Sequence, residues 1–175
     1  MKTKITLAAL VFAMLSGCSS NADMVQSAYY GNYKSITVGQ AFNNWKSCKS
    51  VLWEEFVTEN QAKIVSYTCD LNSDAFFSEV RAVFQKTEGS GYALDVVSAR
   101  IIVEFVINHD NTFKVSGVFR GFTWADGVEK EWSEDSPADV IRSIYGNEII
   151  LDSAGVNAVM AAGLNFSLLM AKKLN

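Results

Sequence analysis

The chain has 175 residues, of which 49% are hydrophobic and 19% are charged, so it can bury the core of one folded domain. Its formal net charge is −4 at pH 7, with 15 lysines and arginines against 19 aspartates and glutamates. The sequence contains no basic stripe that could displace counterions from phosphates, so the composition argues against binding to nucleic acid.

The first 18 residues have three regions in the order of an export signal. Lys2 and Lys4 form a positive region, residues 5–15 form an uncharged apolar run, and the run closes on Leu15-Ser16-Gly17-Cys18. A helix over such a run would cover about half of a roughly 30 Å hydrocarbon core, so a permanent transmembrane anchor is the weaker interpretation. The closing tetrapeptide resembles the lipobox of bacterial lipoproteins. This resemblance implies that residues 1–17 are removed as a signal peptide and that fatty acids such as palmitate are attached to Cys18.

The resemblance also implies a location. Ser19 follows the cysteine, where an aspartate would resemble an inner-membrane retention signal, so we expect the periplasmic face of the outer membrane rather than the inner membrane. Several acyl chains on one residue give a stable membrane anchor, because each buried CH₂ adds about 0.8 kcal/mol. The alternative is an ordinary secretory signal with an incidental cysteine. Removing residues 1–17 takes away two lysines and lowers the net charge from −4 to −6.

Residues 18–35 are mostly small or polar and are predicted to form a lipidated tether. Fully extended, such a segment could reach on the order of 55 Å from the membrane. Tyr29, Tyr30 and Tyr33 either dock on the domain, which we favour, or lie at the bilayer interface. The rest of the chain, residues 36–175, is predicted to fold as a single periplasmic domain.

Thr37-Val38-Gly39-Gln40 has the pattern of a capping box and predicts a short amphipathic helix that ends near Cys48. Residues 51–58 and 63–70 are rich in β-branched and aromatic side chains and predict a hairpin that places Cys69 roughly opposite Leu52. Cys48 lies at the same open end of this hairpin. We therefore expect a disulfide between Cys48 and Cys69 in an exported chain, with two free thiols as the alternative.

The segment 37–69 carries the pattern TVGxAFxxWxxC, followed by WxxF and then VxYxC. It resembles small lipoproteins of the Gram-negative envelope whose role is unassigned. The resemblance covers about a fifth of the chain and implies the class of protein and its location. It transfers no catalytic residue.

The next segment predicts a helix from Ser73 or Asp74 to about Lys86, ended by a break at residues 88–91. Residues 100–107 and 112–124 then predict two strands joined by a turn at 108–111. Pairing them about the turn puts four pairs on one apolar face: Ile107–Phe113, Phe105–Val115, Val103–Gly117 and Ile101–Phe119. The solvated face would carry Arg100, Glu104, Lys114, Ser116 and Arg120.

Asp126-Gly127 predicts a type I′ turn and a third strand of this meander from Val128 to Trp132. The expected fold class is therefore α+β, with an antiparallel sheet of about five strands packed with three to four helices. Ser136-Pro137 predicts a helix to about Tyr145. The last helix, from Asp152 or Ser153 to about Lys173, is apolar on several sides. We expect it to be buried against the sheet, with a membrane span or a helix shared with a partner as alternatives.

No residue pattern indicates catalysis. His109, the only histidine, lies in a predicted turn, and the chain contains no GxSxG, HExxH or P-loop motif. We expect no enzymatic activity, no catalytic residue, no metal site and no cofactor. The candidate binding residues lie in the acidic hairpin flanked by tryptophans, with a solvated loop as the alternative: Trp124, Asp126, Glu129, Glu131 and Trp132.

Two functions fit these features. The first is a non-enzymatic protein-binding or envelope assembly module, which needs an exposed apolar edge or groove, such as the last helix would supply. The second is a periplasmic inhibitor or immunity-type lipoprotein that blocks an enzyme or effector. It needs a protruding loop, for which residues 125–131 are the best candidate. In both cases the expected partners are the membrane, through the lipid on Cys18, and an envelope protein.

Overall fold

The computed structural model describes residues 20–87 and 92–173. The strands are β1 (Cys48–Val57), β2 (Lys63–Leu71), β3 (Val96–Ile107), β4 (Phe113–Trp124) and β5 (Glu129–Ser133). The helices are α1 (Asn21–Ser27), α2 (Val38–Asn43), α3 (Asp74–Thr87), α4 (Pro137–Gly146) and α5 (Ala158–Lys173), with short 3-10 turns η1 (Tyr92–Leu94) and η2 (Ser153–Gly155). The predicted signal peptide, Cys18 and the predicted break at 88–91 lie outside the described residues.

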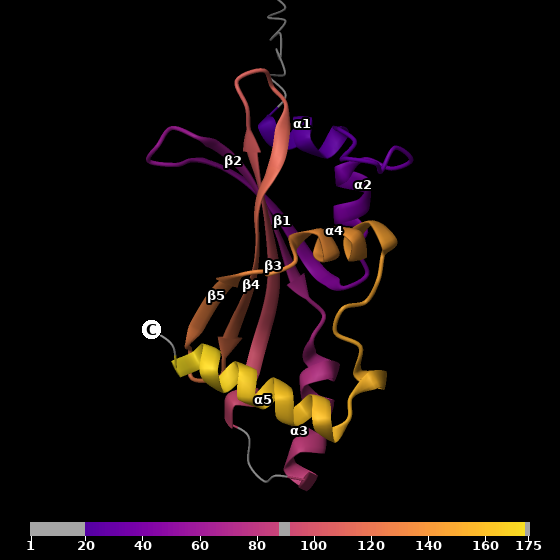
Figure 1. Ribbon diagram of the computed structural model, residues 1–175, viewed down its shortest axis with the longest axis vertical. Helices are drawn as coiled ribbons and strands as arrows, with labels where there is room; N and C mark the ends of the chain where they lie inside the picture. Colours follow the sequence, from indigo (N-terminus) through magenta and orange to yellow (C-terminus); the bar gives the residue numbers. More distant parts are fainter. Residues whose placement is uncertain (1–19, 88–91, 174–175) are drawn as a thin grey trace, which may run out of the picture.

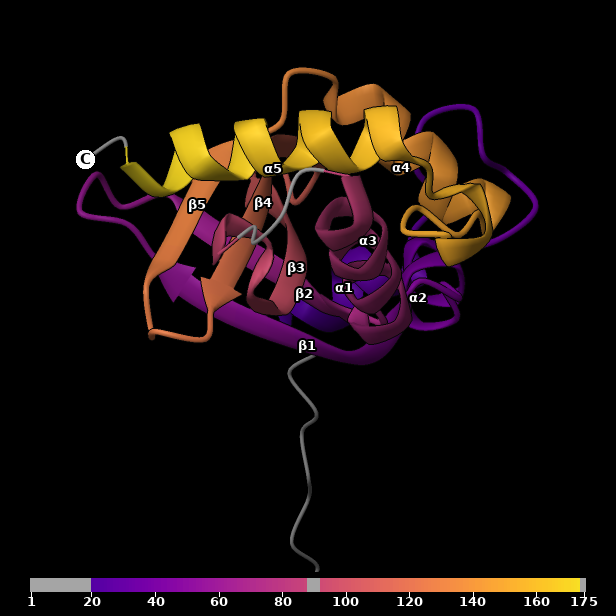
Figure 2. The same cartoon turned by 90° about the horizontal axis from the view of Figure 1, so that it is seen from below.

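The five strands form one sheet in the order β1-β2-β3-β4-β5, with every neighbouring pair antiparallel (Figure 1). The helices gather on one side of the sheet (Figure 2). We call the face they cover the inner face, because its residues join the buried core of α1 to α5: Val65, Tyr67, Cys69, Ile101, Val103 and Phe105. The predicted α+β class with an antiparallel sheet of about five strands is confirmed.

Local signals place most of the helices correctly. The capping box of α2 is formed, since Gln40 N donates to Thr37 Oγ1 at 3.2 Å and Thr37 N donates to Gln40 Oε1 at 2.9 Å. In α3, the predicted apolar stripe buries Phe76, Val80 and Phe84. Helix α2 nevertheless ends at Asn43 rather than near Cys48. The reason is tertiary, because residues 45–47 make hydrogen bonds to the segment after α4 instead of continuing the helix.

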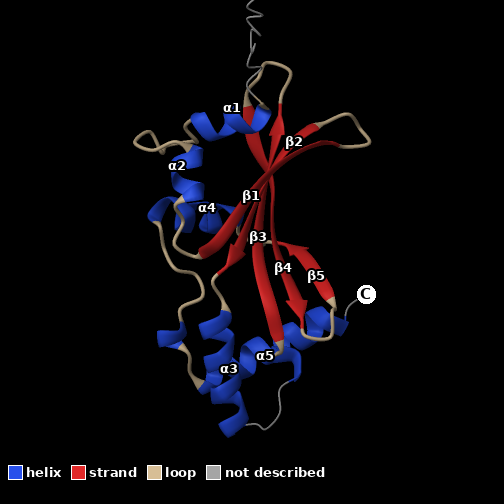
Figure 3. Cartoon of the chain, turned by 180° about the vertical axis from the view of Figure 1, so that it is seen from behind, coloured by secondary structure: helices blue, strands red, loops and turns tan. Residues whose placement is uncertain are grey.

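Residues 20–35 fold against the domain, which corrects the extended tether predicted over 18–35. Ser20 caps α1, accepting from Asp23 N at 3.0 Å, and Val25 is fully buried. Figure 3 shows α1 beside the end of the sheet. Tyr33 stacks on Tyr145 of α4 with the ring centroids 3.9 Å apart, so the favoured docking of the tyrosines is confirmed for this side chain. A helix this short depends on such tertiary contacts rather than on propensity.

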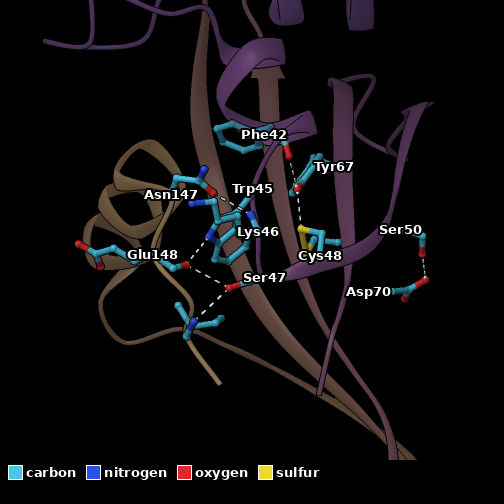
Figure 4. Close-up of a disulfide and its surroundings, with 12 residues drawn as sticks. Phe42, Trp45, Lys46, Ser47, Cys48, Ser50, Tyr67, Asp70, Asn147 and Glu148 are labelled. Carbon is cyan, nitrogen blue, oxygen red and sulfur yellow. Dashed lines mark hydrogen bonds between the residues drawn. A yellow bond between two sulfur atoms is a disulfide. The ribbon is translucent and has the colours of Figure 1, made fainter. Parts of the chain in front are cut away.

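The predicted disulfide between Cys48 and Cys69 is present, with the two Cα atoms 5.4 Å apart (Figure 4). Cys69 lies opposite Val51, one residue from the predicted position, and the register shifts between Cys48 and Ser50. Beneath the bridge, the Tyr67 hydroxyl donates to Phe42 O at 2.9 Å.

The loop before β1 fastens the disulfide to the C-terminal third of the chain (Figure 4). Trp45 Nε1 and Ser47 Oγ both donate to Glu148 O, at 2.7 and 3.1 Å. Ile150 N donates to Ser47 Oγ at 3.0 Å, and Lys46 N donates to Asn147 Oδ1 at 2.8 Å. The open end of the first hairpin is therefore held both covalently and by hydrogen bonds about 100 residues away in sequence.

The pairing of β3 with β4 follows the prediction only near the turn. The confirmed pairs are Ile107–Phe113 and Phe105–Val115. A bulge in β4 at Ser116 then shifts the register by one residue. The observed pairs beyond it are Val103–Val118, Ile102–Phe119 and Ile101–Arg120.

This bulge reverses the faces of two predicted side chains. Phe119 lies on the outer face, where its ring occupies the space beside Gly117; a Cβ there would lie 2.6 Å from the ring. Arg120 lies on the inner face and forms an ion pair with Glu134. The predictions that Phe119 is part of the inner face and that Arg120 is part of the solvated face are therefore wrong.

The three hairpin turns share one geometry, and the predicted type I′ turn at Asp126-Gly127 is not formed. Each has three loop residues, and the third of them has a positive φ: 63° at Gln61, 60° at Asn111 and 81° at Gly127. A type I′ turn would require positive φ at both central residues, and Asp126 does not have it. The observed pattern is typical of a type I turn followed by a bulge residue in the left-handed region.

Candidate functional site

The predicted hairpin site is divided between the two faces of the sheet. The tryptophans belong to the inner face: Trp124 is 1% exposed, and its Nε1 donates to Ala93 O at 2.8 Å. Trp132 is half-buried and stacks on Phe122 with the ring centroids 5.2 Å apart. Glu129 and Glu131 lie on the opposite, outer face. The five residues therefore do not form one surface, and Trp124 is a core residue.

On the outer face, the two glutamates neutralise Arg100. Its Nη2 lies 3.7 Å from a carboxylate oxygen of Glu129 and 3.8 Å from one of Glu131. The arginine side chain crosses Gly121, where a Cβ would lie 2.7 Å from Arg100 Nε. Partial burial, reinforced by the charge of Glu131, raises the pKa of Glu104. Exposed ion pairs of this kind contribute little to stability, so these residues fit the solvated-charge alternative.

Asp126 connects the turn of this hairpin to the C-terminal helix. Its Oδ2 accepts from Lys172 Nζ at 2.6 Å, and its Oδ1 accepts from Val128 N at 3.2 Å. The bond from Lys172, followed by that from Val128, lowers the pKa of the Asp126 carboxyl. Lys172 Nζ also lies 5.5 Å from the centroid of the Trp124 ring. The end of α5 is therefore fastened to the β4–β5 turn.

Helix α5 is buried on one side only, mainly against α3 and η1, which corrects the prediction that it is buried against the sheet. It contacts α3 and η1 and buries Ala161 and Leu168. Its other side exposes large apolar side chains, with exposed fractions of 84% for Val159, 65% for Phe166 and 44% for Met170. No helix in residues 20–87 and 92–173 is long and apolar enough to cross a membrane.

We call the exposed side of α5 the apolar stripe and define it as Val159, Gly163, Phe166 and Met170. These positions follow the spacing i, i+4, i+7 and i+11 and so lie on one side of a helix. No atom outside the helix lies within 4 Å of a Cβ placed at Gly163. The middle of the stripe is therefore open to close approach by another chain.

A groove of about 430 Å³ runs between the end of this stripe and β5. Its lining comes from both elements: Lys130, Glu131, Trp132, Ser167, Met170 and Ala171. Of the five predicted site residues, Glu131 and Trp132 contribute to the groove, and the other three do not: Trp124, Asp126 and Glu129. The candidate site is therefore the apolar stripe with this adjoining groove.

Comparison of the chain with models of protein families, with curated proteins and with solved structures finds no match. Within the described part of the chain, no group of three or more His, Cys, Asp or Glu residues could hold a metal ion.

Proposed function

We propose that the protein is a lipoprotein anchored through Cys18 at the periplasmic face of the outer membrane, where it binds another envelope protein without catalysing a reaction. The observation that carries the binding proposal is the apolar stripe of α5. Contact of such an apolar stripe with water is unfavourable, and an exposed apolar surface beside a groove is typical of a protein interaction surface.

The form of the stripe favours a helical partner. Phe166, exposed over 65% of its surface, can anchor a partner side chain, and the open space at Gly163 allows a second backbone to approach. The i, i+4, i+7 and i+11 spacing of the apolar stripe is that of a surface against which the apolar face of an amphipathic helix can pack, lying along α5. We therefore propose an amphipathic helix of another envelope protein as the ligand.

The geometry gives less support to an inhibitor. An inhibitory loop must reach into the cleft of another protein, and the candidate loop at 125–131 contains a turn of three residues. Ala125 N donates to Asp95 O at 2.8 Å, and Asp126 is held by Lys172 at 2.6 Å. Both contacts hold the turn against its own domain.

The anchor is tested by Cys18→Ser. We expect this variant to be released as soluble protein or to accumulate as uncleaved precursor, whereas the unaltered chain fractionates with the outer membrane. A Cys18→Ser chain that still matures and fractionates as an outer-membrane lipoprotein would refute lipidation.

The binding surface is tested by photocrosslinking in cells. A benzoylphenylalanine at position 159, which is 84% exposed and leaves the space at Gly163 open, should crosslink to an envelope protein identifiable by mass spectrometry. Phe166→Asp should abolish this product without changing the melting curve. Ile149→Asp is the matched control, because Ile149 is 58% exposed and lies outside α5. A crosslink only to a second copy of the chain, or a loss of product in both variants, would contradict the proposal.

A further inference from the structure

The first described residues are held tightly at one end of the sheet. Ala22 N and Asn21 Nδ2 donate to the two carboxylate oxygens of Glu55, at 2.8 and 2.7 Å. Ser20 and Asp23 complete a capping box at the start of α1. Because Glu55 lies in β1, near its end at Val57, the position of Ser20 is fixed relative to this end of the sheet.

Only Ser19 separates Cys18 from Ser20 in the sequence. Two residue steps span at most about 7 Å, whereas an extended tether over 18–35 would reach on the order of 55 Å. A lipid on Cys18 therefore holds the capped end of α1 close to the bilayer surface. This step rests on the lipidation proposed above.

The same end of the sheet carries exposed apolar and cationic side chains. Phe56 is 44% exposed and Val57 is 57% exposed at the end of β1. Lys63, directly opposite Val57, and Lys114, in the same end row as Phe56, are both exposed. Lysine side chains can extend along a surface and place their ammonium groups among lipid headgroups. We define Phe56, Val57, Lys63 and Lys114 as the anchor end.

We propose that the anchor end lies against the lipid surface of the membrane and that the short link to Cys18 holds it there. Helices α1 and α5 lie at opposite ends of the long axis of the molecule (Figure 1). In this orientation the apolar stripe of α5 lies far from the membrane, where an envelope protein can reach it. The occupant of the anchor end is therefore a bilayer, and that of the apolar stripe is a protein.

The orientation is tested with the lipidated full chain, purified from membranes and reconstituted into vesicles of phosphatidylethanolamine and phosphatidylglycerol. Val57→Cys and Val159→Cys each provide a site for an environment-sensitive fluorophore, and labelling without reductant spares the disulfide. Doxyl-labelled lipids should quench the fluorophore several-fold more strongly at position 57 than at position 159. Equal quenching, or stronger quenching at position 159, overturns the inference.

Insertion of ten Gly/Ser residues after Ser19 provides the matched variant. This linker has a root-mean-square length of roughly 17 Å and leaves the lipid and the domain unchanged. We expect it to reduce the quenching at position 57. If the quenching stays the same, the short link does not orient the domain and the inference is wrong. The mass of the peptide that begins at Cys18 separates the two proposals, because an unmodified peptide refutes lipidation itself.

Discussion

Breaking the bridge between Cys48 and Cys69 should destabilise the domain by about 3.4 kcal/mol. The two residues are 21 apart in sequence. When the bridge is broken, the unfolded chain regains the entropy that the closed loop had removed, and for a loop of this size that entropy corresponds to about 3.4 kcal/mol at 25 °C. This is a large share of the 5–15 kcal/mol that is typical of a single domain. The hydrogen bonds from residues 45–47 to residues 147–150 remain after reduction, so we expect a weakened fold rather than a disordered one.

The assay is urea unfolding followed by tryptophan fluorescence, with and without reductant. With a slope of about 2 kcal/mol per molar urea, the midpoint should fall by roughly 1.7 M on reduction. Reduced protein keeps both sulfur atoms, so it isolates the effect of the covalent link. The double variant Cys48→Ala, Cys69→Ala additionally reports the packing lost around Cys69, which is fully buried. Equal midpoints for the oxidised and reduced chains would refute the reasoning.

Three further predictions concern stability. Trp124→Ala should cost about 3–5 kcal/mol in urea unfolding because the side chain is 1% exposed, whereas Ile149→Ala should leave the midpoint nearly unchanged. Gln61→Gly should raise stability by about 1 kcal/mol in the same assay, because it relieves the positive φ of 63°, and Gly127→Ala should lower it. Burial raises the pKa of Tyr145 from 10 to about 12, so the unfolded chain loses this proton first and stability should fall as the pH rises from 10 to about 12. Tyr145→Phe should make that decline shallower in unfolding measured across pH; an unchanged decline would contradict the assignment.

The sequence predicts those elements whose signals are local. The capping box at Thr37, the proline at the start of α4 and the hairpin around residues 59–62 each depend on a few neighbouring residues, and each is found. The predicted pairing of β3 with β4 is wrong beyond the bulge, because one extra residue in β4 shifts every later pair by one position. Gly117, followed by the adjacent apolar residues Val118 and Phe119, interrupts the alternation. A glycine within a strand is the signal that could have located the bulge.

For helix α5, the sequence predicts the helix but not which of its sides stays exposed. Its sequence is apolar on several sides, which predicts burial on several sides. Burial also requires a second surface, and the inner face of the sheet is already shared with α1, α2, α3 and α4. Ala161 and Leu168 therefore reach the core, while Val159 and Phe166 do not. Which side of such a helix remains exposed depends on the space left by the other elements, so periodicity alone could not locate the apolar stripe.

The sequence does not predict helix α1, because the residue that stabilises it lies far away along the chain. Seven residues are too few for a stable isolated helix, and nothing in their pattern specifies a surface on which to pack. Glu55 supplies a negative charge and two acceptors at the positive end of the helix, more than 30 residues along the chain. These bonds, led by that from Ala22 N, lower the pKa of the Glu55 carboxyl, so the contact favours the ionised form. A charge on an edge strand thus determines whether the segment after Cys18 is a tether or part of the domain, and with it the distance at which a lipid would hold the fold.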